Sequence, residues 1–235
     1  MSVIIRNSRI EDFAQVRELQ QRIYPTLAPW SEEQFRRHLE VFPEGQFTAW
    51  IGADLVGAAS SLIVLWDDYG LHHNWPEVTA RGWFDTHDPN GKTLYGAEVF
   101  VDPTIRRMGI GRALYTARRR LCRALKLKRI IAAGRLPGYH RHAQHMSANT
   151  YAMKVIWGDI DDPVLRFQLR QGFQFCGVIE GYLPDDVESC NYAALIVWLN
   201  PEYREPAVRS AGRPRIKPRS QQPKNGALAT DAAPE

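Results

Sequence analysis

The chain has few cysteines and no long apolar segment. Its 235 residues include three cysteines, Cys122, Cys176 and Cys190, and no two of them form a CxxC pair. Scattered cysteines in odd number do not make a disulfide framework and are typical of a reducing compartment. No apolar run reaches the about 18 residues that a membrane-spanning helix needs, and the N-terminus lacks the apolar region of a signal peptide. We therefore predict a cytoplasmic protein without a membrane segment.

The chain also has little net charge outside its C-terminal region. The formal net charge is +4, but residues 201–235 contain seven Lys or Arg and four Asp or Glu, so the remainder is close to neutral. A neutral body gives little reason to expect nucleic acid as a partner. Residues 201–235 are rich in proline and poor in apolar side chains, which predicts a disordered tail. Within the tail, Gly212–Arg215 resembles the core of an AT-hook, but one copy with partly basic flanks favours a solvated tail over a minor-groove ligand.

The most informative feature that is present is a strand followed by a basic turn and a helix. The segment VFVDPTIRRMGIGRAL runs from Val99 to Leu114 and has Gly109 and Gly111 at the start of the helix. The first amides of a helix have no intrahelical partner, and together with the helix dipole they attract phosphate oxygens. Glycine lets the backbone approach an anion closely. The pattern therefore predicts a pyrophosphate site.

Two better-known phosphate motifs do not fit this segment. A Walker loop requires Lys-Ser/Thr after its last glycine, and a dinucleotide fingerprint requires a third glycine where Leu114 stands. The pattern RxxGxG from Arg106 to Gly111, preceded by the VxP of Val101 to Pro103, instead resembles motif A of the GNAT (GCN5-related) N-acetyltransferases. The resemblance implies acetyl-CoA as the acyl donor. It also implies a CoA site that consists of Phe100, Val101, Arg106, Arg107, Met108, Gly109, Ile110, Gly111 and Arg112.

The rest of the chain fits the same family. Periodicity predicts strands at residues 4–6, 47–51, 55–65, 93–101, 129–134, 173–182 and 192–199, and helices over 10–24, after Ser31, and over 109–126, 147–157 and 162–171. Segment 167–173 resembles the second GNAT signature, with Gln168 in place of its tyrosine. The resemblance covers roughly residues 1–200 and implies the α/β GNAT acyl-CoA N-acyltransferase fold, a central mixed sheet of about seven strands flanked by helices. We expect most arginines of helix 109–126 to form a solvated face: Arg112, Arg118, Arg119, Arg120 and Arg123.

Two insertions, residues 66–92 and 136–161, interrupt this order. Both follow strands beside the phosphate site, and long loops in compact domains commonly bind ligands, so we expect them to form walls of the acceptor site. Three histidines of the second insertion, His140, His142 and His145, lack the i, i+4 spacing of a helical zinc site. Acetyl transfer does not require a metal, so we predict none.

A more specific resemblance lies in three segments: Gly138–His140, the residues from Asp162 to Phe173, and the YLPDD that begins at Tyr182. They are similar to the acetyltransferase module that some proteins carry N-terminal to a carbon–nitrogen hydrolase domain. Here we expect the module to stand alone, and a separate hydrolase partner remains open.

The predicted reaction is transfer of an acetyl group to a primary amine, by direct transfer in a ternary complex. Glu98, on the strand that leads to the phosphate site, is the candidate general base, and an amide near Phe100 or Val101 would stabilise the oxyanion. Gln168 cannot act as an acid. Tyr139, Tyr151, Tyr182 or solvent would then protonate the leaving thiolate, and His140 is a further catalytic candidate.

Two points stay open at this stage. The alternative function is a non-catalytic acyl-CoA-binding regulatory module, which the missing tyrosine of the second signature favours. The identity of the amine is not visible in the sequence, and a homodimer is one assembly compatible with it.

Overall fold

The computed structural model describes residues 2–25, 27–70, 72–105 and 108–205. The chain divides into two units, residues 1–204 and 205–235, and the fold described below is that of the first. Arg106, Arg107 and the predicted tail beyond residue 205, with its AT-hook-like segment, lie outside the described residues.

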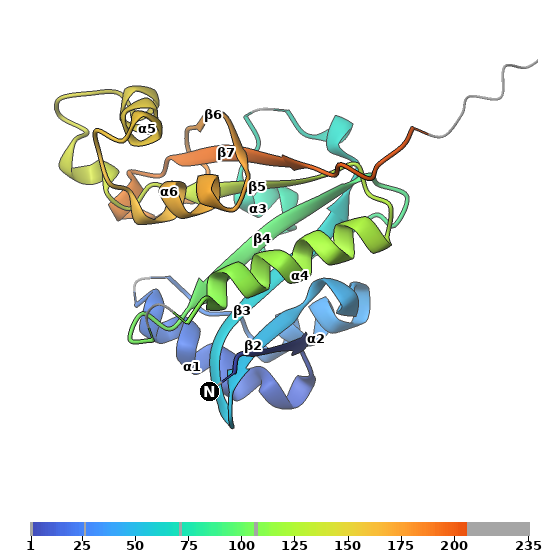
Figure 1. Ribbon diagram of the computed structural model, residues 1–235. Helices are drawn as coiled ribbons and strands as arrows, with labels where there is room; N and C mark the ends of the chain where they lie inside the picture. Colours follow the sequence, from blue (N-terminus) through green and yellow to red (C-terminus); the bar gives the residue numbers. More distant parts are fainter. Residues whose placement is uncertain (1, 26, 71, 106–107, 206–235) are drawn as a thin grey trace, which may run out of the picture. The chain divides into compact units, whose positions relative to one another are not determined.

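Seven strands form one mixed sheet in the order β1-β2-β3-β4-β5-β7-β6 (Figure 1). They are β1 (Ile4–Asn7), β2 (Phe47–Ile51), β3 (Asp54–Val64), β4 (Thr93–Val101), β5 (Arg129–Arg135), β6 (Gln174–Ile179) and β7 (Ala193–Leu199). Neighbouring strands are antiparallel except β4 and β5, which run parallel. The predicted mixed sheet of the GNAT fold is therefore confirmed, and the predicted strand 93–101 matches β4 residue for residue.

Helices cover both faces of this sheet (Figure 1). They are α1 (Phe13–Ile23), α2 (Glu32–Val41), α3 (Trp75–Val78), α4 (Ile110–Ala124), α5 (Ala148–Trp157) and α6 (Pro163–Arg170). Successive residues of a strand point to opposite faces. Accordingly, Tyr95 of β4 packs in the core that contains α1 and α2, whereas Leu94 packs in the core that contains α4, α5 and α6.

Local sequence explains where two of these helices begin. The Ser31 hydroxyl accepts a hydrogen bond from the Gln34 amide at 3.2 Å, and the Gln34 side chain accepts one from the Ser31 amide at 3.0 Å, which is a capping box at α2. Asp162 caps α6, because its Oδ1 accepts hydrogen bonds from the amides of Val164 and Leu165 at 3.0 and 2.9 Å.

The sheet opens between β4 and β5. The two strands pair from Thr93 opposite Arg129 as far as Gly96 opposite Ala132. Beyond that point β4 continues to Val101 against β3 alone, and β5 continues to Arg135 against β7. A bulge in the β3–β4 ladder between Ser60 and Ser61 accompanies the divergence. Backbone groups of β4 after Gly96 therefore face a gap instead of a neighbouring strand.

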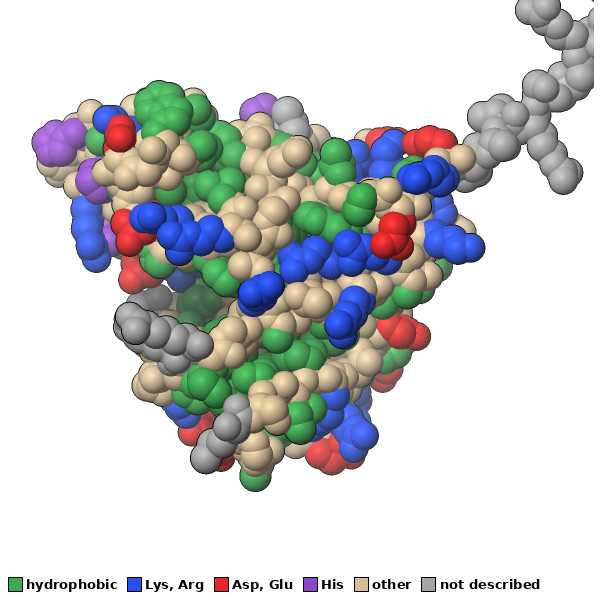
Figure 2. Space-filling model, viewed as in Figure 1, with side chains coloured by type: hydrophobic (Ala, Val, Ile, Leu, Met, Phe, Trp, Pro, Cys, Tyr) green, Lys and Arg blue, Asp and Glu red, His purple; other side chains and the backbone are tan. Residues whose placement is uncertain are grey.

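Arg118 of α4 differs from the expected solvated arginine face. Basic side chains do gather around the outer side of α4 (Figure 2), where Arg112 and Arg120 are exposed. Arg118, in contrast, is only 2% exposed. Its Nε donates to the Ser61 hydroxyl at 3.0 Å, and its Nη2 donates to the carbonyls of Ser60, at 2.6 Å, and Glu98. The prediction was wrong for this residue because the bulge exposes carbonyls that a buried guanidinium satisfies.

Candidate active site

A cavity of about 1210 Å³ lies where β4 and β5 diverge. Its walls come from the strands β4 and β5 and from the helices α1, α4 and α6. Three loops complete them: the segment after α1, residues 75–81 of the first insertion, and residues 182–188. A volume of this size can hold an acyl-CoA arm together with a small acceptor. The gap in the sheet and the cavity are therefore the same feature.

One end of the cavity is formed by the start of α4. Met108, Gly109, Ile110, Gly111 and Arg112 all line it, and these are residues at which the sequence predicts the phosphate site. Gly109 has a φ of 70°, and a Cβ there would meet nothing within 4 Å, so this glycine is needed for its backbone conformation.

Gly111 is needed for a different reason. A Cβ at this position would lie 2.9 Å from Cζ of Phe167, so the second glycine allows α4 and α6 to pack closely. Free amides at the start of a 15-residue helix, with Arg112 beside them, suit a pyrophosphate. The residues present therefore fit the CoA that the motif implies.

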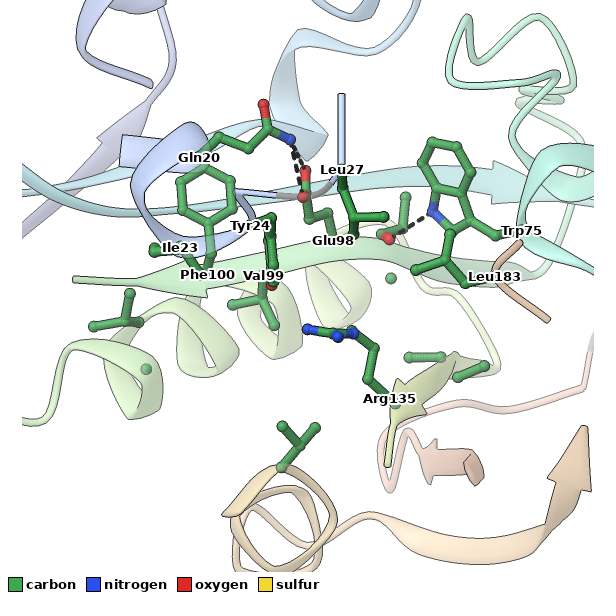
Figure 3. A pocket seen from close by; sticks show the side chains of 18 of the residues that line it. Gln20, Ile23, Tyr24, Leu27, Trp75, Glu98, Val99, Phe100, Arg135 and Leu183 are labelled. Atoms are coloured by element: carbon green, nitrogen blue, oxygen red, sulfur yellow. Dashed lines mark hydrogen bonds between the residues drawn. The ribbon is translucent and has the colours of Figure 1, made fainter. Parts of the chain in front are cut away.

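Glu98 lies further along β4, in the same cavity. Nε2 of Gln20, from α1, donates to both carboxylate oxygens of Glu98, at 3.0 and 3.1 Å (Figure 3). Oε1 of Gln20 accepts a hydrogen bond from the Trp30 amide at 3.0 Å. Because a backbone amide can only donate, the Trp30 contact fixes the Gln20 side chain with its NH₂ toward Glu98.

Burial changes the pKa of the Glu98 carboxyl group. It raises the pKa of Glu98 to about 7, and the Gln20 hydrogen bond and the Arg118 charge, which both lower the pKa, offset burial only in part. A carboxylate that titrates near neutral pH is matched to the removal of a proton from an amine. Phe100 and Val101, the predicted sources of an oxyanion-binding amide, follow Glu98 on the same cavity-lining strand.

Two predicted catalytic residues do not line the cavity. Tyr139 is buried, and its hydroxyl donates to the Met146 carbonyl at 3.1 Å. His140 is exposed, and its Nδ1 lies 2.9 Å from each of the carbonyls of Pro137 and Glu188. The structure therefore does not bring Tyr139 and His140 to Glu98, because the second insertion packs around its own tyrosines instead.

The first insertion does reach the cavity, through Trp75, Pro76 and Arg81. Trp75 is fixed at two points: its amide donates to the Tyr182 carbonyl at 2.8 Å, and its indole Nε1 donates to the Ala97 carbonyl at 3.0 Å (Figure 3). Trp75 therefore ties the insertion to β4 one residue before Glu98.

Sequence reasoning missed several residues of the site. Gln20 could have been found, because it is a polar residue on the apolar stripe of α1 that Val16 and Leu19 define. Arg135 and Tyr24 carry no such signal. Gln168, in the position of the usual tyrosine, donates to the Tyr115 hydroxyl at 3.3 Å and packs against Gly134.

Among the described residues, no group of three His, Cys, Asp or Glu side chains is arranged to hold a metal ion. No helix in the described part of the chain is long and apolar enough to cross a membrane.

Comparison with known proteins agrees with this geometry. The sequence profile of the family described as "Acetyltransferase (GNAT) family" matches residues 13–147, more than half of the chain. The chain belongs to the GNAT acetyltransferase family. The predicted family resemblance is thereby confirmed.

Two relatives come from Bacillus subtilis (strain 168). "Probable hydrolase YhcX" is 43% identical over 201 residues, which are 86% of this chain and 39% of YhcX. The chain thus spans well under half of that relative. "Uncharacterized N-acetyltransferase YkwB" is 35% identical over 208 residues, which are 87% of this chain and 92% of YkwB.

Solved structures share the fold at low sequence identity. The loading GNATL domain of CurA from Lyngbya majuscula has a TM-score of 0.73 at 19% identity, and the match covers 85% of this chain and 98% of that domain. The GphF GNAT-like decarboxylase in complex with isobutyryl-CoA has a TM-score of 0.69 at 22% identity, with 84% and 99% covered.

Proposed function

We propose that this protein is an acetyl-CoA-dependent N-acetyltransferase that acts on a primary amine by direct transfer in a ternary complex. The observation that carries the proposal is Glu98, a carboxylate with a pKa of about 7, held by Gln20 in the cavity that begins at the α4 phosphate site. The likeness to YkwB and the acetyl-CoA motif support the choice of an amine and an acetyl group.

In this proposal each residue has a defined task. Gly109, Gly111 and Arg112 hold the pyrophosphate, with Arg106 and Arg107 as further candidates outside the described residues. Glu98 accepts a proton from the ammonium group of the acceptor, so that the acceptor nitrogen becomes a nucleophile. An amide of Phe100 or Val101 stabilises the negative charge that develops on the acyl oxygen. None of the three cysteines lines the cavity, which favours direct transfer over an acylated cysteine.

The second candidate function is a non-catalytic acyl-CoA-binding module. It draws on one observation, that Gln168 stands where the family signature has a tyrosine. Release of free thiol from acetyl-CoA with a panel of primary amines separates the two, because a binding module produces none above the rate without protein. YhcX is named a probable hydrolase, but this chain spans only 39% of it, so that name does not support hydrolysis by this chain.

The variant that tests the base is Glu98→Gln. It keeps the shape of the side chain and removes the proton acceptor, so kcat is expected to fall about 10²–10⁴-fold at neutral pH. The loss should shrink at high pH, where more of the amine is already unprotonated. Glu18→Gln makes the same change on the exposed side of α1 and serves as the control. Near-native turnover by Glu98→Gln would overturn the assignment.

The phosphate site has an independent test. Gly109→Glu introduces a side chain and a negative charge at the start of α4, so CoA affinity is expected to fall roughly 100-fold or more. Isothermal calorimetry with CoA measures this directly. Glu98→Gln should retain CoA affinity, because Glu98 lies on β4 and the amides proposed to hold the pyrophosphate lie at the start of α4.

A further inference from the structure

The cavity contains an arginine for which the proposed reaction has no use. Arg135 is the last residue of β5, and its side chain reaches into the gap between β4 and β5 (Figure 3). Along β5, Ile131, Ala133 and Arg135 alternate onto the face that α1 covers. Glu98 contacts Gln20 of α1 on this same face. The Glu98 carboxylate and the Arg135 guanidinium therefore lie on one face of the sheet, on the two strands that diverge, and the chamber is the part of the cavity beside these two residues.

Two carboxylates hold the guanidinium of Arg135 in place. Its Nε donates to Oδ2 of Asp186 at 2.7 Å, and its Nη2 donates to Oδ1 of Asp186 and, at 2.9 Å, to Glu188. The guanidinium also lies over the ring of Tyr24, 5.4 Å from its centroid. Burial works to lower the pKa of Arg135, but the hydrogen bonds and charge of Asp186 outweigh it and raise the pKa, so the group is always a cation.

This arrangement leaves one guanidinium nitrogen of Arg135 free to bind a ligand. Nη1 of Arg135 has no hydrogen-bond partner among the described residues, while the edge formed by Nε and Nη2 is saturated. The Arg135 side chain is 22% exposed, so Nη1 is open to an acceptor oxygen that a ligand supplies. Asp186 is buried, but Glu188 is 62% exposed, so water screens its negative charge from a ligand in the chamber.

Apolar side chains form part of the remaining wall, and the charged side chains of Arg81, Asp185 and Glu188 also line the cavity. Leu27, Trp75 and Leu183 surround the space beside Glu98 and Arg135 (Figure 3). These side chains offer contact area to a hydrocarbon or an aromatic ring. The chamber thus combines the Glu98 carboxylate, the Arg135 guanidinium and apolar side chains that can contact a substrate.

We propose that the acceptor is an amino acid with an apolar side chain, with its amine at Glu98 and its carboxylate on Nη1 of Arg135. This inference rests on the proposed acetyl transfer and adds the substrate class. Arg135 acts as a specificity-determining residue: the charge-assisted hydrogen bond to a carboxylate selects the substrate. Monoamines, polyamines and protein N-termini lack a carboxylate near the amine and are poor acceptors.

Matched pairs of acceptors test the inference in the unmodified full chain. Leucine is compared with 3-methylbutylamine, and phenylalanine with 2-phenylethylamine, by thiol release from acetyl-CoA. Each amino acid is expected to exceed its amine roughly 10- to 100-fold in kcat/KM, the worth of one charge-assisted hydrogen bond. Equal rates within a pair, or faster amines, overturn the inference and leave the proposed function intact. No thiol release from any acceptor, with CoA still bound, overturns the proposed function itself.

Two variants separate Arg135 from a purely structural role. Arg135→Lys keeps a positive charge beside Asp186 but loses the planar guanidinium. The double variant Arg135→Met with Asp186→Asn removes both charges together, so that neither is left buried without a partner. Both are expected to bring each amino acid down to the level of its amine and to abolish calorimetric binding of leucine to the CoA-loaded protein. Arg129, on the same strand and face, donates to Thr93 outside the cavity, so Arg129→Lys is the control. A raised KM for acetyl-CoA, with an unchanged ratio of kcat/KM between each amino acid and its amine, would assign Arg135 to the acetyl-CoA site and overturn the inference.

Discussion

The two insertions are nearly equal in length, yet only the first contributes described residues to the cavity. Residues 66–92 reach it through Trp75, Pro76 and Arg81, whereas the described cavity lining includes none of residues 136–161. Both segments begin at the end of a strand, so their starting points do not explain the difference. Their anchors do: Trp75 binds the β4 carbonyl of Ala97, whereas the second insertion is held by Asp162 at the start of α6.

The anchors also differ in chemistry. His38 of α2 donates from Nε2 to the Gly82 carbonyl at 2.6 Å and stacks on Phe84 at 3.8 Å between centroids, which fixes the first insertion against α2. In the second, Asp162 accepts hydrogen bonds from the Tyr151 hydroxyl at 2.9 Å and the Gly138 amide at 3.3 Å. An imidazole and a carboxyl group are altered by different substitutions, so the two insertions can be perturbed one at a time.

The largest expected effect is on the cavity wall. Trp75→Ala removes the indole that binds Ala97 next to Glu98, so kcat/KM for the acceptor is expected to fall about 10²-fold, as misplacement at a reacting centre does. The KM for acetyl-CoA should change little, because the phosphate site is separate. Steady-state kinetics with both substrates varied measures this. Trp83→Ala, at a 41% exposed position of the same insertion, is the control, and an equal loss in both variants would contradict the comparison.

We expect low pH to destabilise the contact between His38 of α2 and the first insertion. Burial lowers the pKa of His38 from its ordinary 6.5 to about 4, although the Gly82 hydrogen bond raises it. The folded state therefore binds fewer protons than the unfolded state between these values, and stability falls as the pH drops from about 6.5 to 4. The loss is on the order of 3 kcal/mol when complete. Urea unfolding at pH 7 and pH 4.5 measures most of it.

His38→Gln is the matched variant for this test. A glutamine amide can donate to the Gly82 carbonyl but does not titrate, so the histidine part of the pH dependence should disappear. An unchanged slope between pH 4.5 and 7 in this variant would show that other groups cause the acid sensitivity.

Most of the fold was predictable because it depends on local patterns. Strand 93–101, the Ser31 cap and the glycines of the phosphate site all follow from residues that lie next to one another. The position of Glu98 was predictable for the same reason, since it lies on the strand that leads into that motif, and its role as a base stays a prediction. These features need no knowledge of which distant segments meet.

The rest of the site depends on contacts between distant segments. Gln20 meets Glu98 across 78 positions of the chain, and Arg135 meets Asp186 across 51. Arg118 is buried only because the β3–β4 bulge leaves carbonyls for it to satisfy. The expectation that residues 136–161 line the acceptor site was wrong for a related reason. The path of a loop depends on the residues that hold it, and Asp162, which holds this loop, follows its last residue.

A smaller effect is expected at the anchor of the second insertion. Tyr151→Phe removes one donor from Asp162, which keeps its three backbone donors, so the free energy of unfolding should fall by about 1–2 kcal/mol. Turnover should stay within about twofold, because Tyr151 does not line the cavity. Thermal unfolding and thiol release measure the two quantities. A large loss of turnover at unchanged stability would mean that this insertion acts in the reaction.

The smallest effect is expected at Tyr139, the sequence-based candidate for the acid. Tyr139→Phe removes only the hydrogen bond to the Met146 carbonyl, so stability should fall by about 1 kcal/mol or less and kcat should stay within about twofold. Thiol release at several pH values tests this, since an acid that protonates the thiolate would show its loss most clearly at neutral pH. A fall in kcat of about 10²-fold or more, the usual worth of a positioned acid, would bring the second insertion into the active site and reverse the comparison.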